Sequence, residues 1–107
     1  MFFDNEKYYA FVERCRQEGI DVPIIPGIKP VVFKNQLNVL PKVFRTDIPE
    51  AFASELRKCT TDEEVKVLGV EWCKAQCKDL LAHGVPGLHF YTFMASDSVY
   101  KVVKEVY

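Results

Sequence analysis

The chain has 107 residues, of which 49% are hydrophobic and 27% are charged, a composition typical of one small globular domain. Its 14 basic and 15 acidic residues give a formal net charge of −1, which argues against the strongly basic surface of a nucleic-acid-binding protein. No apolar run approaches the roughly 20 residues that cross a bilayer, and no signal-peptide pattern is visible, so we expect a cytoplasmic protein.

The first predicted helix follows three apolar residues, Met1 to Phe3. Asp4 or Asn5 would cap this helix at its N-terminus, and Gly19 would end it. Its apolar residues recur at the i, i+3, i+4 and i+7 spacing of an amphipathic helix: Tyr8, Phe11, Val12 and Cys15.

The stretch DVPIIPGI predicts a buried strand of the parallel kind, because a short apolar run lies between prolines. The apolar residues of this strand would be Val22, Ile24, Ile25 and Ile28. Two short helices are predicted next. The first covers residues 35–44, with Pro41 kinking or shortening it and Val43 and Phe44 on its apolar face; the second begins near Pro49.

The stretch TDEEVKVLGVEWCKAQCKDLLAHG predicts the longest helix. Thr61 and Glu64 form a capping-box pattern at its start, Gly84 ends it, and Gly69 is a weak point inside it. The predicted apolar face consists of Val65, Leu68, Val70, Trp72, Cys73, Cys77, Leu80 and Leu81. After it, VPGLHFYTF predicts a second strand and SDSVYKVVKEVY a last helix with Val99, Val102, Val103 and Val106 on one face.

Four cysteines occur: Cys15, Cys59, Cys73 and Cys77. Without a secretory signal we expect reduced thiols. Cys73 and Cys77 would share a helix face, but neither Cys59 nor His83 completes a familiar zinc spacing, so buried thiols are favoured over a metal site.

Strands separated by helices predict parallel pairing, yet two strands are too few to cover so many amphipathic helices. We therefore expect neighbouring strands to be missing, with Met1 to Phe3 as the tail of a third strand.

Parallel α/β proteins place their sites at the carboxyl ends of strands. In the second predicted strand, His89 and Tyr91 would share one face. A buried core residue is the favoured interpretation of His89, and Tyr91 is the better candidate for a site residue. Gln36 is either a ligand contact or, the favoured reading, a solvated helix residue.

Several stretches together resemble one enzyme family. FFD is followed by RCRQEGIDVPIIPGIKPV, by a glutamine in the next helix, and then by GVEWCKAQCKDLLAHGVPGLHFYT. In this order they closely resemble the C-terminal part of the catalytic domain of methylenetetrahydrofolate reductases, over nearly the whole chain.

The resemblance implies a fold and a reaction. The family folds as a (β/α)8 TIM barrel, so the chain would be an α/β partial barrel covering the end of strand 6 through helix 8, with residues 1–107 as a single incomplete domain. Family members pass hydride from NADH or NADPH to FAD, and then to 5,10-methylenetetrahydrofolate, giving 5-methyltetrahydrofolate. The implied cofactor is FAD and the implied ligands are the folate and NAD(P)H, with no nucleic acid or membrane partner.

The resemblance also suggests four substrate-binding residues. Gln36 matches a glutamine that contacts the folate, and Leu40 matches an apolar residue that packs on its aminobenzoate ring. Tyr91 and His89 match the tyrosine and histidine of HFYT, of which the tyrosine lines the pocket. The family often continues TLNR, whose arginine contacts the glutamate tail, whereas this chain reads TFMA and has Ala95 there.

No catalytic residue is expected within the chain, because the resemblance places the catalytic glutamate and almost all FAD contacts on strands before Met1. We therefore expect the 107 residues to be inactive alone and either to self-associate or to need a missing N-terminal barrel half. The alternative is a non-catalytic, stand-alone binding or assembly module derived from the same barrel. The DNA upstream of the Met1 codon would distinguish the two.

Overall fold

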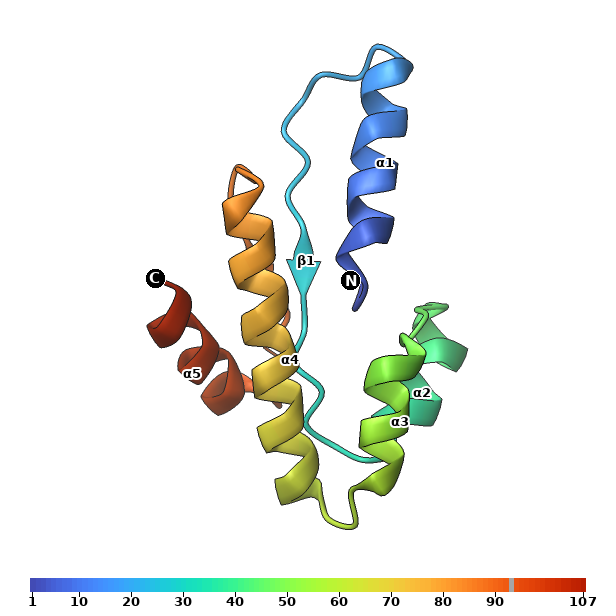
Figure 1. The fold of residues 1–107 in the computed structure, drawn as a ribbon, viewed down its shortest axis with the longest axis vertical. Coiled ribbons are helices and arrows are strands. Elements are labelled where there is room, and N and C mark those ends of the chain that lie inside the picture. Colours follow the sequence, from blue (N-terminus) through green and yellow to red (C-terminus); the bar gives the residue numbers. More distant parts are fainter. Residues whose placement is uncertain (93) are drawn as a thin grey trace.

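The computed structural model describes residues 1–92 and 94–107, which contain five helices and two short strands (Figure 1). Along the chain these are α1 Asn5–Gln17, β1 Gly27–Ile28, α2 Gln36–Phe44, α3 Glu50–Lys58, α4 Asp62–Ala82, β2 His89–Phe90 and α5 Ser96–Val106. The predicted order of helices and strands is confirmed. Phe93, the last residue of the predicted second strand, lies outside the described residues.

Helix α4 is the central element, because α1, α3 and α5 all pack against it. Figure 1 shows α5 on one side of α4 and β1 and α1 on the other. The predicted N-cap of α4 is confirmed, since the Thr61 hydroxyl accepts the Glu64 backbone N–H at 3.3 Å. In the same turn, the Glu64 carboxylate accepts a hydrogen bond from the Thr60 hydroxyl at 2.8 Å.

The two strands form a parallel pair, as predicted, with Gly27 opposite His89 and Ile28 opposite Phe90. The His89 N–H donates to the Pro26 carbonyl at 3.0 Å, and the Tyr91 N–H donates to the Ile28 carbonyl at 2.9 Å. Each strand is only two residues long, much shorter than predicted. Pro23 and Pro26 contribute to this, because neither has an N–H to donate to a neighbouring strand.

The prediction of a strand buried along its whole length is wrong. Ile28 is fully buried, whereas Ile25 is 56% exposed and Val22 is 58% exposed. Successive side chains of an extended segment point to opposite faces. Ile28 packs on the helix layer beside α4, while Ile25 alternates to the other face, which no element of the described chain covers.

Two predicted apolar faces are also narrower than expected. Phe11 of α1 and Val43 and Phe44 of α2 are each more than half exposed. Pro41 does not shorten α2, which continues to Phe44. A helix stripe is buried only where another element lies against it, and the described chain provides such elements along only part of each stripe.

The core consists of two clusters of buried residues, one toward each end of α4. The first lies among α2, α3 and α4 and contains Phe3, Val31, Leu40, Phe52, Leu56, Cys59 and Val65. The second lies among α1, β1, α4 and α5 and contains Tyr8, Ile28, Val70, Cys73, Cys77, Leu80 and Val102. In the first cluster, Phe52 and Trp72 stack with parallel rings 4.5 Å apart.

The N-terminal residues pack on α4, but they do not form the predicted strand. Phe3 is buried, at 2% exposed, and its carbonyl accepts the Trp72 indole N–H at 2.9 Å. The Phe2 carbonyl accepts a hydrogen bond from the Gln76 side chain at 3.1 Å. Side chains of α4 therefore satisfy backbone groups that a neighbouring strand would otherwise pair with.

Gly69, the expected weak point of α4, is needed for packing. A Cβ atom at Gly69 would lie 2.0 Å from the carbonyl oxygen of Val31. The segment that leaves β1 crosses α4 at this residue, and only the absence of a side chain permits the close approach.

Cys73 and Cys77 are buried at 1% and 0% exposure, in agreement with the favoured prediction of buried thiols. A hydrogen bond with Cys77, together with burial, raises the pKa of the Cys73 thiol. Within the described residues, no group of three or more His, Cys, Asp and Glu side chains is placed to hold a metal ion.

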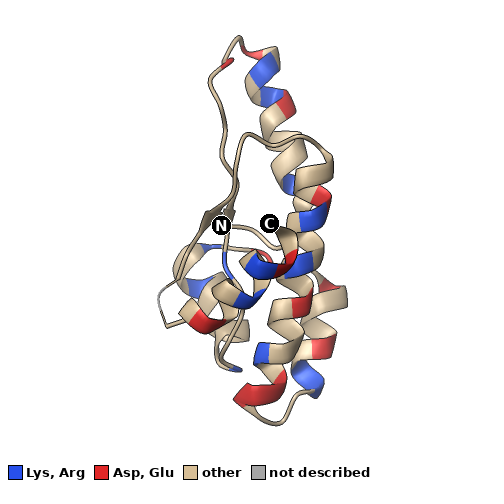
Figure 2. Cartoon of the chain, turned by 90° about the vertical axis from the view of Figure 1, so that its left-hand side faces the viewer, with Lys and Arg blue, Asp and Glu red and all other residues tan. Residues whose placement is uncertain are grey.

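Charged residues of both signs are interspersed along the helices (Figure 2). This distribution agrees with the near-zero net charge of the sequence. Among residues 1–92 and 94–107, no helix combines the length and the apolar character needed to cross a membrane.

Candidate functional site

A pocket of about 750 Å³ lies at the carboxyl end of the two strands. This volume is within the range of small-molecule sites, about 300–1,000 Å³. The residues that follow β1 and β2 line it together with one side of α2, and they include Lys29, Gln36, Leu40, Thr46, Tyr91 and Met94. The pocket therefore lies where parallel α/β proteins place their ligands.

The pocket brings together three of the four residues suggested as substrate contacts. Gln36 and Leu40 come from α2, and Tyr91 directly follows β2. His89 is not among the lining residues; it lines a neighbouring hollow of about 480 Å³ that it shares with Tyr91 and Gly27.

Gln36 is held in place by the backbone that precedes it. Its side-chain oxygen accepts the Val32 N–H at 2.7 Å and the Phe33 N–H at 3.0 Å. The side chain is half-buried, so the favoured reading of a solvated helix residue is wrong. Because both lone pairs of Oε1 are used, the NH₂ group is the part of the amide left to donate to a ligand.

Leu40 belongs both to the pocket wall and to the first core cluster, and it is only 2% exposed. Val39 and Phe44 extend the apolar wall along the same helix. This side of the pocket thus offers apolar surface to a planar ring, and core packing fixes its position.

Tyr91 and Gly27 fit against each other across the strand pair. A Cβ atom at Gly27 would lie 2.8 Å from Cε2 of Tyr91, so the glycine makes room for the ring. The His89 ring meets Tyr91 edge-on, with centroids 4.9 Å apart, which confirms that the two side chains share a face. Both are exposed, however, so the prediction of a buried His89 is wrong.

Sequence reasoning missed Lys29. It is the first residue after β1, it lines the pocket, and it is only 8% exposed. Burial lowers the pKa of its ammonium group. Its position directly after a predicted strand is the sequence signal that could have identified it.

The resemblance implies an arginine at the position of Ala95, and this position does not reach the pocket in this chain. Ala95 is 3% exposed and is not among the lining residues. Its neighbour Met94 is 68% exposed, lines the pocket, and has a left-handed backbone with φ of 55°.

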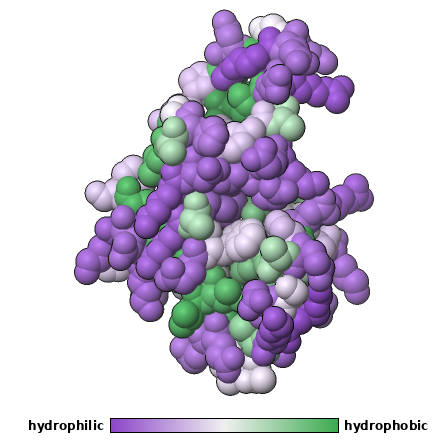
Figure 3. All heavy atoms as spheres, viewed as in Figure 1, coloured by the Kyte–Doolittle hydropathy of each residue, from purple (hydrophilic) through white to green (hydrophobic). Residues whose placement is uncertain are grey.

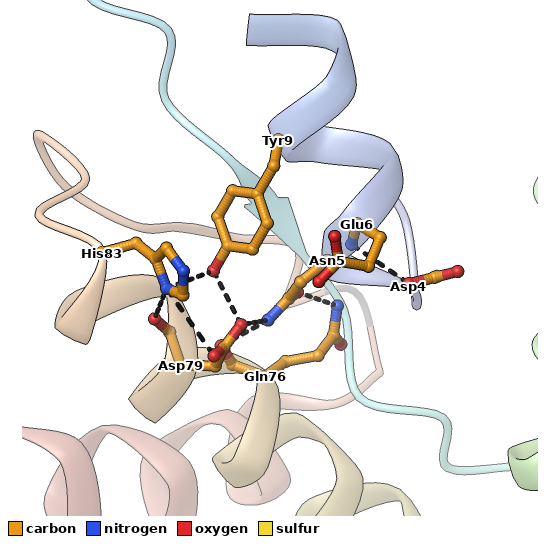
Figure 4. A network of polar contacts seen from close by, with 7 residues as sticks. All are labelled: Asp4, Asn5, Glu6, Tyr9, Gln76, Asp79 and His83. Atoms are coloured by element: carbon orange, nitrogen blue, oxygen red, sulfur yellow. Dashed lines mark hydrogen bonds and ion pairs between the residues drawn. The ribbon is translucent and has the colours of Figure 1, made fainter. Parts of the chain in front are cut away.

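A separate polar cluster joins α1 to the end of α4 (Figure 4). The Tyr9 hydroxyl donates to the Asp79 carboxylate at 2.7 Å, and the Asn5 amide donates to the same oxygen at 2.9 Å. These two hydrogen bonds lower the pKa of Asp79, and burial followed by the bond to Asp79 raises the pKa of Tyr9. His83 Nδ1 lies 3.0 Å from the Tyr9 hydroxyl. None of these residues lines the pocket, so the cluster holds two helices together.

Comparison with known proteins assigns the chain to a family. The family model described as methylenetetrahydrofolate reductase matches residues 1–107. The chain is 35% identical over 102 residues to the 5,10-methylenetetrahydrofolate reductase of Escherichia coli, covering 94% of this chain and 34% of that protein. It is 35% identical over 99 residues to methylenetetrahydrofolate reductase (NADH) 1 of Arabidopsis thaliana, covering 92% of this chain and 17% of that protein.

A probable methylenetetrahydrofolate reductase (NADPH) of Caenorhabditis elegans is 32% identical over 108 residues, which cover 99% of this chain and 16% of that protein. The chain therefore spans between 16% and 34% of the length of these three relatives. Since the family model covers every residue, the chain belongs to the methylenetetrahydrofolate reductase family.

Proposed function

We propose that the chain is the C-terminal segment of the catalytic barrel of a methylenetetrahydrofolate reductase and that it supplies part of the folate pocket. The intact enzyme reduces 5,10-methylenetetrahydrofolate to 5-methyltetrahydrofolate with NAD(P)H through FAD. In this proposal the chain covers the end of strand 6 through helix 8 of a TIM barrel, and residues 1–107 are a single incomplete domain.

The observation that carries the proposal is the meeting of Gln36, Leu40 and Tyr91 around one pocket. More than 50 residues separate Tyr91 from the other two, and the parallel pairing of β1 and β2 brings their carboxyl ends together. The Gln36 NH₂ group donates to a folate heteroatom, Leu40 packs on the aminobenzoate ring, and the Tyr91 hydroxyl borders the ligand. His89 positions the Tyr91 ring by its edge-on contact.

The open face of the sheet supports the proposal of an incomplete domain. Phe11, Ile25 and Tyr91 are all exposed, although each is large and apolar or aromatic. Phe11 and Ile25 line one hollow together with Tyr91. Figure 3 shows apolar side chains between the polar ones on the surface. Such surface is usual where further elements of a domain pack.

The described residues do not by themselves fit FAD. The two phosphates of this dinucleotide need several N–H donors or cations, and Lys29 is the only charged side chain among the described residues that line the pocket. We therefore assign no flavin contact and no hydride-transfer step to this chain. Its residues bind and orient the folate, and the remainder of the barrel supplies the flavin site.

The proposal is tested by replacing the matching third of the E. coli 5,10-methylenetetrahydrofolate reductase with this chain. The chimera should oxidise NADH or NADPH when 5,10-methylenetetrahydrofolate is present, whereas the 107 residues alone should be colourless and inactive. Gln36→Leu in the chimera should lower kcat/KM, and Lys101→Met on the exposed face of α5 should not. A folded, yellow chimera without folate-dependent activity would contradict the proposal.

A further inference from the structure

The segment between β1 and α2 has three successive backbone N–H groups that donate to side chains. The Gln36 side-chain oxygen accepts the N–H groups of Val32 and Phe33 at 2.7 Å and 3.0 Å. The next N–H group, that of Lys34, donates to the Asp62 carboxylate at 2.8 Å. Asp62 is the first residue of α4 and lies 28 residues further along the chain. A side chain of α4 therefore holds the segment that Gln36 binds.

Helix α2 begins without a side-chain cap of its own. Its N-cap residue, Asn35, makes no side-chain capping hydrogen bond. The Lys34 carbonyl accepts the Leu37 N–H in the first turn of α2 at 3.3 Å. Lys34 thus joins two helices, because its N–H donates to α4 and its carbonyl accepts from α2. The start of α2, where Gln36 lies, is tied to the long helix through Asp62.

Asp62 itself does not belong to the wall of the pocket at the strand ends. Phe33, Asn35 and Gln36 line that pocket, and Asp62 is not among the lining residues. Asp62 lines a neighbouring hollow, together with Phe33, Lys34 and Asn35. The segment held by Asp62 therefore separates the two hollows, and one side of it contributes to the pocket. A contact between Asp62 and this segment reaches a ligand only through the position of the segment.

We infer that Asp62 is a positioning residue of the folate pocket. By accepting the Lys34 N–H, it fixes the backbone that orients the Gln36 NH₂ group. Asp62 is exposed, so without it the Lys34 N–H would bond to water and the fold would persist. The freed segment would have to be ordered again when a ligand binds, and this ordering lowers affinity. The inference rests on the proposed function, because it takes a folate as the ligand.

The test measures the dissociation constant of the 107-residue chain for 5-methyltetrahydrofolate by NMR titration. Asp62→Ala should weaken binding by about 2- to 10-fold, the change that corresponds to the loss of one hydrogen bond. Asp62→Asn, whose amide oxygen can still accept the Lys34 N–H, should restore most of the affinity. Glu63→Ala should leave the affinity unchanged. It is the matched control, because Glu63 has the same charge in the same helical turn and its carboxylate contacts Lys66.

The charge of Asp62 and its hydrogen bond predict opposite results. A folate is an anion at neutral pH, so the loss of a nearby negative charge would strengthen its binding. The loss of the hydrogen bond to Lys34 would weaken it. The ligand-free spectra provide a second readout, since the Gln36 NH₂ resonances should shift in Asp62→Ala and stay in place in Glu63→Ala. Both variants remove a favourable charge from the start of α4, so a general loss of helix stability would affect them equally.

A measurement on the wild-type chain needs no variant. Coupling between two sites is reciprocal, so folate binding must strengthen the contact of Asp62 with Lys34 by the factor by which the contact strengthens folate binding. Exchange of the Lys34 amide hydrogen should therefore slow by about 2- to 10-fold when the chain is saturated with 5-methyltetrahydrofolate. If Asp62→Ala does not fold, as judged by circular dichroism, this slowing together with the affinity of Asp62→Asn decides the result.

Two sets of outcomes are distinguishable. Equal effects of Asp62→Ala and Glu63→Ala on affinity, tighter binding by Asp62→Ala, or unchanged exchange at Lys34 would overturn the positioning role and leave the proposed function standing. Binding by Asp62→Asn that is as weak as that by Asp62→Ala would also overturn it. If the wild-type chain does not bind 5-methyltetrahydrofolate, the inference and the proposed function fail together.

Discussion

Substitution of Gly69 by alanine tests how the pocket is attached to the rest of the fold. The segment after β1 carries Lys29 and the backbone N–H groups bound by Gln36, and it crosses α4 at Gly69. A Cβ atom there would lie 2.0 Å from the Val31 carbonyl oxygen and 3.0 Å from the Val31 carbonyl carbon. Ordinary contact begins at 3.4 Å, so α4 and this segment would have to separate by about 1.4 Å, the difference between 3.4 and 2.0 Å.

Two opposing terms set the size of the effect. Alanine in place of a helical glycine stabilises a helix by about 1 kcal/mol. Overpacking of a core costs about 1–3 kcal/mol and occasionally more, and this case belongs at the upper end because the obstacle is backbone. We expect Gly69→Ala to lower the free energy of unfolding by about 1–3 kcal/mol and to weaken folate binding, because the displaced segment carries part of the pocket wall.

Urea denaturation monitored by the fluorescence of Trp72, the only tryptophan, measures this change. Gly87→Ala is the control, since a Cβ atom at Gly87 meets no atom within 4 Å. If Gly69→Ala were instead more stable than the wild type by about 1 kcal/mol, helix propensity alone would account for the change and the packing argument would be refuted.

Three further predictions concern the pocket and the helix junction. Gln36→Leu removes the acceptor of two backbone N–H groups and should cost about 1–3 kcal/mol in urea unfolding, whereas Gln36→Glu, which keeps the acceptor oxygens, should cost less. Gly27→Ala should leave stability nearly unchanged, because the Tyr91 ring can swing away, but it should shift the Tyr91 ring resonances and weaken folate binding; unchanged resonances would count against the fit between them. Hydrogen bonds from Tyr9 and Asn5 lower the pKa of Asp79, so its stabilising contribution is present above the unfolded-state pKa, about 3.9, and is lost as pH falls through the lower folded-state value. Asp79→Asn should therefore flatten the decline of the urea midpoint below about pH 4, and an unaltered acid profile would be evidence against the cluster's role.

Local signals allowed the helices to be predicted from the sequence. Thr61 caps α4 and Asp4 caps α1 through contacts within a few residues, and these caps were readable without the fold. The parallel pairing of β1 and β2 followed from the alternation of helices and strands. Burial was less predictable, because Ile25 and His89 belong to a sheet face that the described chain leaves uncovered.

The site was predictable only in part, for a related reason. Resemblance to a family pointed to Gln36, Leu40 and Tyr91, and the structure places all three around one pocket. The anchoring of Gln36 by backbone N–H groups, the role of Gly69 and the burial of Lys29 all depend on where the segment after β1 runs. That path is set by packing against α4, which is distant in the sequence.

The central claim is that this pocket binds a folate. The NMR resonances of the side-chain amide groups test this claim most directly. In ¹H–¹⁵N NMR spectra of the 107-residue chain titrated with 5-methyltetrahydrofolate, the Gln36 NH₂ resonances and the Tyr91 backbone resonance should shift together. The Gln76 NH₂ group, which binds Phe2 and Asn5 away from the pocket, should not shift. Absence of any shift at Gln36 and Tyr91 at millimolar folate, or equal shifts at Gln76, would contradict the account.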